Sequence, residues 1–411
     1  MSGLKEERAK WIASALRHSW RVDATPLSLT EDQLASITPL LIQSGAAGLV
    51  WSRAKISALK DTKSAARLRR AFLSQVIQAT LREHELARLF ACMRAARVEP
   101  IVVKGWATAS RYPEKGLRPQ GDIDLIVRPE SLQAAQSVLN SPECEALNVD
   151  LEHREFARLN VRAFDELYER SRSVPLGGTE VRMLSAEDHL SFLCRHSLRH
   201  GAWRPLWLCD IALELENRPA DFDWDLLRRR KREYHAVESA ILLAHHLIDA
   251  SLEGTPMAVT RAQSQQRADN RGVSLRQPEA RGARTEKFRG VEAPAGPLGD
   301  GESRPPRWFI RAVLEQWEIS DPMQHAPFNH LKPMASYLRD PSGIVHGLKA
   351  RWPNPIEATI SLGGRFNEVP RFPFQLVESI LRTIKFLTGL ARVGPGFPKG
   401  TAVQRSAEEI G

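Results

Sequence analysis

Residues 102–127 read VVKGWATASRYPEKGLRPQGDIDLIV, and two apolar runs in this stretch lie beside charged side chains. Side chains of an extended strand alternate between two faces, so Asp122 and Asp124 share one face while Ile123 and Leu125 point into the core. Two carboxylates this close raise each other's pKa, so a fold that keeps both usually supplies a cation. Mg²⁺ suits the pair, because it binds one or two carboxylates together with substrate phosphates, and two such ions can clamp a phosphoryl displacement.

Lys104 and Gly105 follow the first apolar run, residues 100–103, which has the β-branched composition of a buried strand. Gly105 lets the backbone approach a ligand, and Lys104 adds a point charge. The helical pattern that follows would present free N–H groups to an anion. Arg111 and Arg118 offer the forked donor geometry with which arginine binds phosphate. Lys104, Gly105 and Arg118 are therefore the predicted phosphate-binding residues, with Arg111 as a further candidate.

These residues resemble the DNA polymerase β-type nucleotidyltransferase superfamily, specifically a bacterial family of uncharacterised nucleotidyltransferases whose strand-turn reads Lys-Gly rather than Gly-Ser. Residues 184–216 and, more loosely, residues 338–362 also carry the resemblance. It implies an α+β fold, with a nucleotidyltransferase-like mixed sheet core and large helical N- and C-terminal parts. It also implies magnesium, with two ions held by Asp122 and Asp124, and a nucleoside triphosphate substrate such as ATP.

The resemblance further implies a third carboxylate on a neighbouring strand, acting as base or as second metal ligand. Asp150 and Glu152 share one face of residues 148–153. Asp150 is the first choice, because a short side chain suits a metal already fixed by two carboxylates, and Glu152 is an accessory candidate. His153 lies one position later than in the family pattern, which leaves a non-catalytic protein open.

Three histidines follow a predicted helix cap at Ser185. His189, His196 and His200 are separated by seven and four residues, a spacing that places them on one stripe of a helix. Such a stripe either contacts a nucleotide or packs against the α/β core with each imidazole hydrogen-bonded, and packing is the favoured interpretation. His196, together with Asp210 on the next helix, is an accessory site candidate.

Composition along the chain predicts five regions. They are a helical N-terminal region (1–97), a nucleotidyltransferase α/β core (98–183), a helical domain (184–260), a disordered linker or insertion (261–306) and a mostly helical C-terminal region (307–411). A capping box is predicted at residues 30–33. The last clear element is an amphipathic helix at residues 374–390, which either docks on the core or lies on a membrane surface. Docking is the favoured interpretation.

Charge and hydropathy limit the function classes. The net charge of +9 over 411 residues could attract nucleic acid, but arginine-rich residues 228–232 and 261–305 hold much of the excess. A solvated helix face and a basic linker explain these runs, so nucleic acid is the less favoured partner. No run of eighteen apolar residues exists, which predicts no transmembrane segment. The first ten residues are rich in charge and lack the apolar stretch of a signal peptide, so we expect a cytoplasmic protein.

The expected function is Mg²⁺-dependent transfer of a nucleoside monophosphate to a hydroxyl of an acceptor, either a small molecule or a protein. Two alternatives belong to other classes. One is a non-catalytic regulator that binds a nucleotide or a partner, and the other is a basic nucleic-acid-binding protein. Mg²⁺-dependent nucleotide binding without turnover would indicate the first, and a steep salt dependence of nucleic-acid affinity would indicate the second.

Overall fold

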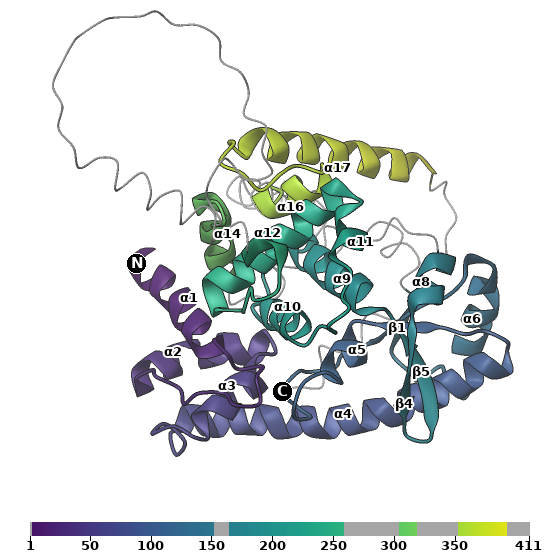
Figure 1. The fold of residues 1–411 in the computed structure, drawn as a ribbon, viewed down its shortest axis with the longest axis horizontal. Coiled ribbons are helices and arrows are strands. Elements are labelled where there is room, and N and C mark those ends of the chain that lie inside the picture. The colour runs from purple at the N-terminus through teal and green to yellow at the C-terminus, as the bar shows by residue number, and fades with distance from the viewer. Residues whose placement is uncertain (1, 152–163, 259–303, 319–351, 393–411) are drawn as a thin grey trace, which may run out of the picture.

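The structure is a computed structural model that describes residues 2–151, 164–258, 304–318 and 352–392 (Figure 1). The strands are β1 (Ile101–Val103), β2 (Ile123–Ile126), β3 (Val149–Leu151), β4 (Arg172–Leu176) and β5 (Thr179–Met183). The helices before β3 are α1 (Ser2–Leu16), α2 (Glu31–Gln43), α3 (Ala47–Ala54), α4 (Lys63–Ala95), α5 (Gly105–Ala109) and α6 (Leu132–Leu139). The later helices are α8 (Phe164–Arg170), α9 (Ala186–Arg199), α10 (Leu206–Glu216), α11 (Trp224–Arg228), α12 (Lys231–Ile248), α14 (Arg307–Trp317), α16 (Pro355–Ser361) and α17 (Phe372–Arg392).

The five strands form one mixed sheet in the order β3-β2-β1-β5-β4. β1 pairs antiparallel with β2 and parallel with β5, β2 pairs parallel with β3, and β4 and β5 form an antiparallel hairpin. β1 and β2 are buried along their whole length; β1 is wholly apolar, and β2 is apolar except for Asp124. A mixed sheet with large helical parts confirms the predicted α+β fold class.

Helix α4 joins two hydrophobic cores. Its first residue follows Thr62, whose hydroxyl accepts a hydrogen bond from the Ala65 amide at 3.2 Å and so caps the helix. Apolar residues of its first half, such as Leu68 and Phe72, pack in the helical core, whereas Leu86 and Phe90 of its second half pack under the sheet. Figure 1 shows α4 running along one edge of the whole molecule. The sheet and the helical part are therefore fixed to one long helix.

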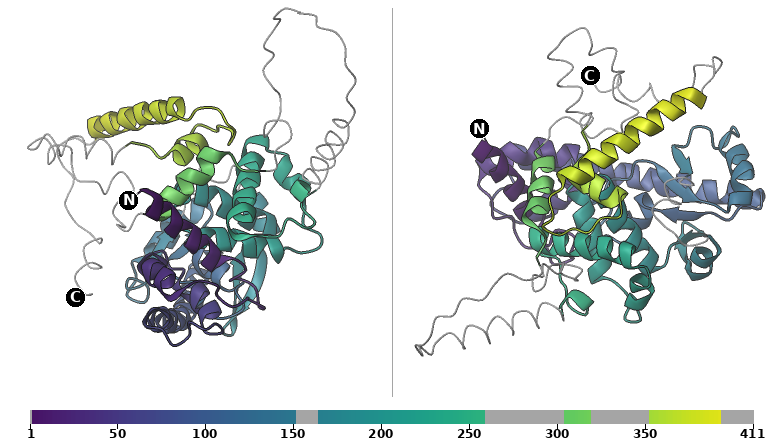
Figure 2. Two further views of the ribbon diagram at one scale, coloured as in Figure 1. Left: turned by 90° about the vertical axis from the view of Figure 1, so that its left-hand side faces the viewer. Right: turned by 90° about the horizontal axis from the view of Figure 1, so that it is seen from above.

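The helical parts of the chain share one hydrophobic core. Side chains from α1 to α3, the first half of α4, α9, α10, α12, α14 and α16 meet there, and two views of Figure 2 show these helices gathered beside the sheet. The capping box on Thr30 and Gln33 and the cap on Ser185 are both present, as predicted. The predicted domain boundaries stay predictions, and residues 259–303, most of the predicted linker, lie outside the described residues.

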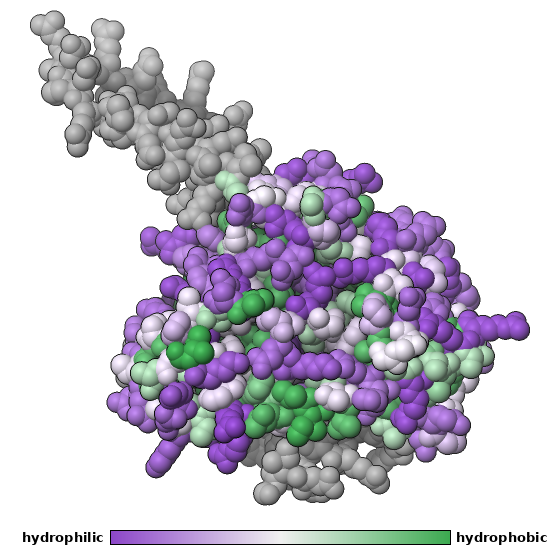
Figure 3. All heavy atoms as spheres, turned by 60° about the horizontal axis from the view of Figure 1, so that its bottom comes forward, coloured by the Kyte–Doolittle hydropathy of each residue, from purple (hydrophilic) through white to green (hydrophobic). Residues whose placement is uncertain are grey.

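Large apolar side chains are exposed on several elements, and those of α4 and α17 are grouped along one face of each helix. In Figure 3, which brings the α4 side forward, hydrophilic residues cover most of the face and apolar patches lie between them. Leu73, Ile77 and Leu81 of α4 are among the exposed apolar residues. Within the described ranges, no helix has both the length and the apolar character needed to cross a membrane.

Candidate active site

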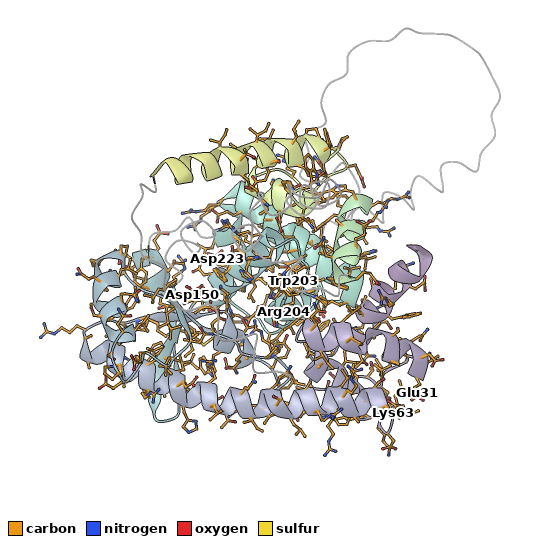
Figure 4. The ribbon with its side chains drawn as sticks, turned by 180° about the vertical axis from the view of Figure 1, so that it is seen from behind. Glu31, Lys63, Asp150, Trp203, Arg204 and Asp223 are labelled. Atoms are coloured by element: carbon orange, nitrogen blue, oxygen red, sulfur yellow. The ribbon has the colours of Figure 1, made fainter. Side chains whose placement is uncertain are left out.

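Strand register brings three carboxylates together at one end of the sheet. The Cα of Asp124 on β2 pairs with that of Val103 at the end of β1 and with that of Asp150 on β3. Paired residues on neighbouring strands project to the same face, and Asp122 shares that face because it lies two positions before Asp124. One carboxylate oxygen from each of the three aspartates lies within 4.8 Å of the others. Figure 4 labels Asp150 beside the sheet.

The cluster combines one buried carboxylate with two exposed ones. Asp124 is 3% exposed, and its Oδ1 lies 3.0 Å from Lys104 Nζ. Asp122 and Asp150 open to solvent. Three carboxylates this close repel one another, and a divalent cation between them would offset that repulsion. The three oxygens lie close enough together that one divalent cation could take a ligand from each, and Mg²⁺ prefers such oxygen ligands.

The turn between β1 and α5 is held in an uncommon backbone conformation. Lys104 has a φ of +48° and Gly105 a φ of +30°. Strain at a residue with a side chain persists only where surrounding structure enforces it, and such residues cluster at functional sites. A Cβ on Gly105 would lie 3.1 Å from the Asp122 carbonyl oxygen and 3.8 Å from Asp124 Oδ2. Glycine therefore allows the turn to approach the carboxylates closely.

Helix α5 is shorter than the sequence predicts. The helix spans Gly105–Ala109, five residues, whereas the sequence predicts a helix over residues 105–112. The predicted anion site at its N-terminus is therefore not supported, because so short a helix has little dipole. The charges that remain for a phosphate are those of side chains.

Arg118 and Asp210, both predicted site residues, bind each other. Arg118 Nε donates to Asp210 Oδ1 at 3.0 Å and to Oδ2 at 3.1 Å, and Arg118 Nη1 donates to the Gly105 carbonyl at 3.0 Å. The Tyr112 hydroxyl donates to Asp210 Oδ1 at 2.8 Å. Arg118 is 7% exposed and Asp210 is fully buried. The pair therefore fixes the Lys104–Gly105 turn to helix α10.

The pKa values around this pair follow from burial and charge. Burial alone would lower the pKa of Arg118, but Asp210 outweighs it, so the pKa is raised and the guanidinium stays charged. Burial and the Asp210 charge raise the pKa of Tyr112 well above its usual value, so the phenol stays neutral. One fixed ion pair therefore lies behind the carboxylate cluster.

Two stretches of the sequence match the profile of one known protein family. The profile of a family described as uncharacterised nucleotidyltransferase matches residues 30–161 and, in a second match, residues 141–250. Together the two matches cover more than half of the chain. The chain belongs to this nucleotidyltransferase family. No curated protein and no solved structure matches it.

The first family match contains the turn at Lys104 and all three aspartates, and the second contains α9, α10 and α12. β3 and Asp150 lie in the stretch that both matches cover. Glu152, the accessory carboxylate, lies outside the described residues, as does His153. Membership in a nucleotidyltransferase family supports a transferase that uses a nucleotide, and confirms the resemblance seen in the sequence.

The histidines on α9 occupy different surroundings. His189 is 1% exposed, and its ring nitrogens lie 3.2 Å from Thr108 Oγ1 and 3.3 Å from Glu214 Oε1. This contact between α9, α5 and α10 confirms the packing interpretation for His189. Arg111 also faces inward, 3.5 Å from Glu214 Oε1. It is thereby tied to α10.

His196 lies nearer the candidate site. Its ring stacks on Phe192 with centroids 6.0 Å apart and meets Trp207 edge-on at 5.0 Å. Burial lowers the pKa of His196 well below its usual value, and His200, Lys104, Arg118 and Arg204 lower it further. The imidazole is therefore neutral near pH 7 and adds no positive charge for phosphate.

Arg204 is a candidate site residue that the sequence interpretation missed. Its Nε donates to the Ser44 carbonyl at 2.6 Å, and its Nη2 occupies space that a Cβ on Gly45 would need. Burial and the charge of Arg118 lower its pKa to about 10, while Asp210 and Asp122 act in the opposite direction. It stays charged near pH 7, and Figure 4 shows it toward the middle of the molecule. The only sequence signal was a charge between two tryptophans, Trp203 and Trp207.

Proposed function

We propose that the protein is a Mg²⁺-dependent nucleotidyltransferase that moves a nucleoside monophosphate from a nucleoside triphosphate to a hydroxyl of an acceptor. The observation that carries the proposal is the set of three aspartate oxygens within 4.8 Å of one another, in a chain of a nucleotidyltransferase family. Other phosphoryl transfers work in the same way, by positioning and electrostatic stabilisation.

The aspartates have distinct roles in this proposal. Asp122 and Asp124 would hold Mg²⁺, and Asp150 would either hold a second ion or accept the acceptor's proton. Mg²⁺ supplies charge neutralisation at the α-phosphate and at the leaving oxygens. The acceptor oxygen forms a bond to the α-phosphorus while the bond from that phosphorus to the bridging oxygen breaks. Pyrophosphate leaves with the bond's electron pair, and the hydroxyl proton passes to Asp150 or to water.

The basic side chains separate into two roles. Lys104, whose Nζ lies 3.0 Å from Asp124 Oδ1, contacts the phosphates, and the charged Arg204 is a further candidate for the same role. Arg118, whose Nε and Nη1 bind Asp210 and Gly105, adds positive charge from behind the turn and positions it. Asp210 is therefore a positioning residue, and His196 borders the nucleotide as a neutral group.

The test is incubation of the purified protein with each α-labelled nucleoside triphosphate, Mg²⁺ and cell extract, followed by identification of the labelled molecule. The wild-type chain is expected to label one class of acceptor. Asp150→Asn is expected to lower the transfer rate by about 10²–10⁴-fold with little change in nucleotide affinity, because a base acts mainly in the transition state.

Glu152→Gln is the matched comparison, since it changes the carboxylate two positions after Asp150 in the sequence. It is expected to retain far more activity than Asp150→Asn. The opposite ranking would transfer the role to Glu152. Nucleotide binding without any labelled product would contradict the enzymatic proposal and favour the regulator, and RNA or DNA affinity with a steep salt slope would favour the nucleic-acid-binding alternative.

A further inference from the structure

A series of aromatic rings begins beside the carboxylate cluster and continues along helix α9. Its first member, Phe192, packs in one hydrophobic cluster with Val103 of β1, whose Cα pairs with that of Asp124. Paired strand residues project to the same face of a sheet, so Phe192 covers the face that carries Asp124. Lys104 Nζ, 3.0 Å from Asp124 Oδ1, also lies 5.9 Å from the centroid of the Phe192 ring. The series therefore starts at the candidate active site.

Four further rings extend the series away from the sheet. His196 stacks on Phe192 with centroids 6.0 Å apart. The centroids of His200 and Trp207 lie 4.5 Å and 5.0 Å from that of His196. Trp207 also contacts His200 at 5.7 Å and Trp203 at 5.6 Å, so it touches three of the other rings. We call these five side chains the ring cluster.

The exposure of the ring cluster changes along its length. Phe192 is 1% exposed, as expected of a ring that only packs a core. His200, Trp203 and Trp207 are partly exposed. The end of the cluster farther from the sheet therefore presents aromatic surface to solvent, where a ligand can reach it.

Arg204 adds a positive charge to the exposed end of the ring cluster. It follows Trp203 directly, and Figure 4 shows these two side chains toward the middle of the molecule. A Cβ on Gly45 would lie 2.5 Å from Arg204 Nη2 and 2.7 Å from Pro119 Cγ, so the guanidinium lies beside Pro119. Pro119 is three positions before Asp122. The loop that carries the outer rings is therefore a neighbour of the segment that leads into the carboxylate cluster.

Aromatic rings beside cations are the combination that binds nucleotides. A base stacks on an aromatic side chain through its π-face, and cations along the same groove bind the phosphates. Stacking accepts any base, and preferences arise from the strength of stacking rather than from hydrogen bonds. A purine presents two fused rings and a pyrimidine only one, so a site of this kind favours purines.

We propose that the ring cluster binds the base of the nucleoside triphosphate by stacking, with Trp207 as its central ring, and that it favours purine bases. The base lies at the partly exposed rings of His200, Trp203 and Trp207, while the triphosphate extends past Lys104 to the three aspartates. This proposal rests on the proposed function, because it takes the aspartate cluster as the place of the triphosphate.

The test compares two ligands that share a triphosphate, ATP and inorganic tripolyphosphate, in equilibrium binding to the full-length protein with Mg²⁺. Trp207→Leu is expected to weaken ATP binding by about tenfold or more, the loss typical of removing a ring that stacks on a base, and to change tripolyphosphate binding by less than about twofold. Trp207→Phe keeps an aromatic ring and is expected to retain most of the ATP affinity. The wild-type chain is expected to bind ATP and GTP at least about threefold more tightly than CTP and UTP.

The matched control is Trp352→Leu. It removes a tryptophan that is 41% exposed and stacks on Phe372 of α17, outside the ring cluster. This variant is expected to bind both ligands like the wild-type chain. A photoreactive 8-azido-ATP, used on the wild-type chain alone, gives a second readout that does not depend on how any variant folds. It is expected to label residues 200–207.

The outcomes separate this proposal from the proposed function. Unchanged ATP affinity in Trp207→Leu, equal affinity for all four nucleoside triphosphates, or photolabel confined to other residues would overturn the ring cluster as the base site while leaving the transferase proposal intact. Equal losses of ATP and tripolyphosphate in Trp207→Leu would show that Trp207 is structural, and would also overturn it. A wild-type chain that binds neither ligand would overturn both proposals.

Discussion

Asp124→Asn is expected to abolish detectable nucleotidyl transfer, a larger loss than the roughly 10²–10⁴-fold typical of removing a general base. The substitution keeps the shape of the side chain while removing one negative charge from the centre of the carboxylate cluster. Asp124 is the cluster's buried member and the partner of Lys104 at 3.0 Å, so no neighbouring group can take its place. Steady-state transfer of label from the preferred nucleoside triphosphate measures the loss.

Asp225→Asn is the matched control for this variant. The side chain of Asp225 is 80% exposed on α11, and the same chemical change there is expected to leave the rate unaltered. Thermal melts of Asp124→Asn without Mg²⁺ are expected to fall below those of the wild-type chain, because Lys104 loses its buried partner, so the rates are compared at a temperature at which both chains are folded. Near-normal turnover in Asp124→Asn would show that the metal ligands have been assigned wrongly.

Arg118→Met is expected to lower the free energy of unfolding by roughly 3–5 kcal/mol, because it leaves the buried carboxylate of Asp210 without its charge partner. Asp210 is fully buried, so water cannot compensate the loss. Tyr112→Phe removes only one hydrogen bond from the same carboxylate and is expected to cost about 0.5–1.5 kcal/mol. Urea unfolding followed by circular dichroism gives both values.

The double variant Arg118→Met with Asp210→Leu shows how much of the stability loss comes from the unpaired charge and how much from packing. The double variant is expected to be more stable than Arg118→Met alone, since no isolated charge remains buried. A loss below about 1 kcal/mol in Arg118→Met would contradict the role of this pair in fixing the turn.

Local patterns predicted the central part of the site. Alternation along a strand placed Asp122 and Asp124 on one face, and short polar caps at Thr30 and Ser185 marked helix starts that the structure confirms. These features depend on neighbours a few residues away. The prediction that Asp150 joins the pair came from family resemblance, and the parallel pairing of β2 with β3 brings it there.

Long-range contacts escaped prediction. The role of Arg118 in binding phosphate stays a prediction. The sequence did not show that its Nε and Nη1 bind Asp210 and Gly105, because that contact depends on α10 packing behind the turn. Arg204 gave no periodic signal, and the Ser44 carbonyl that binds its Nε lies 160 positions earlier in the chain.

The apolar residues of α17 form a stripe of helical periodicity, and periodicity alone does not show whether such a stripe is buried or exposed. The hydrogen bond from Ser361 to Glu378 and the ion pair of Arg382 with Glu357 fix the rotation of α17 and leave the stripe exposed, so the predicted docking of the stripe on the core is wrong.

The most direct measurement of the proposed metal site is anomalous scattering from crystals grown with Mn²⁺ and a non-hydrolysable nucleoside triphosphate. Mn²⁺ replaces Mg²⁺ here because both prefer carboxylate and phosphate oxygens. We expect an anomalous peak bounded by the carboxylates of Asp122, Asp124 and Asp150, in contact with the triphosphate, and loss of that peak in Asp124→Asn. A nucleotide bound elsewhere in the molecule, or bound at this cluster with no metal beside it, would contradict the account.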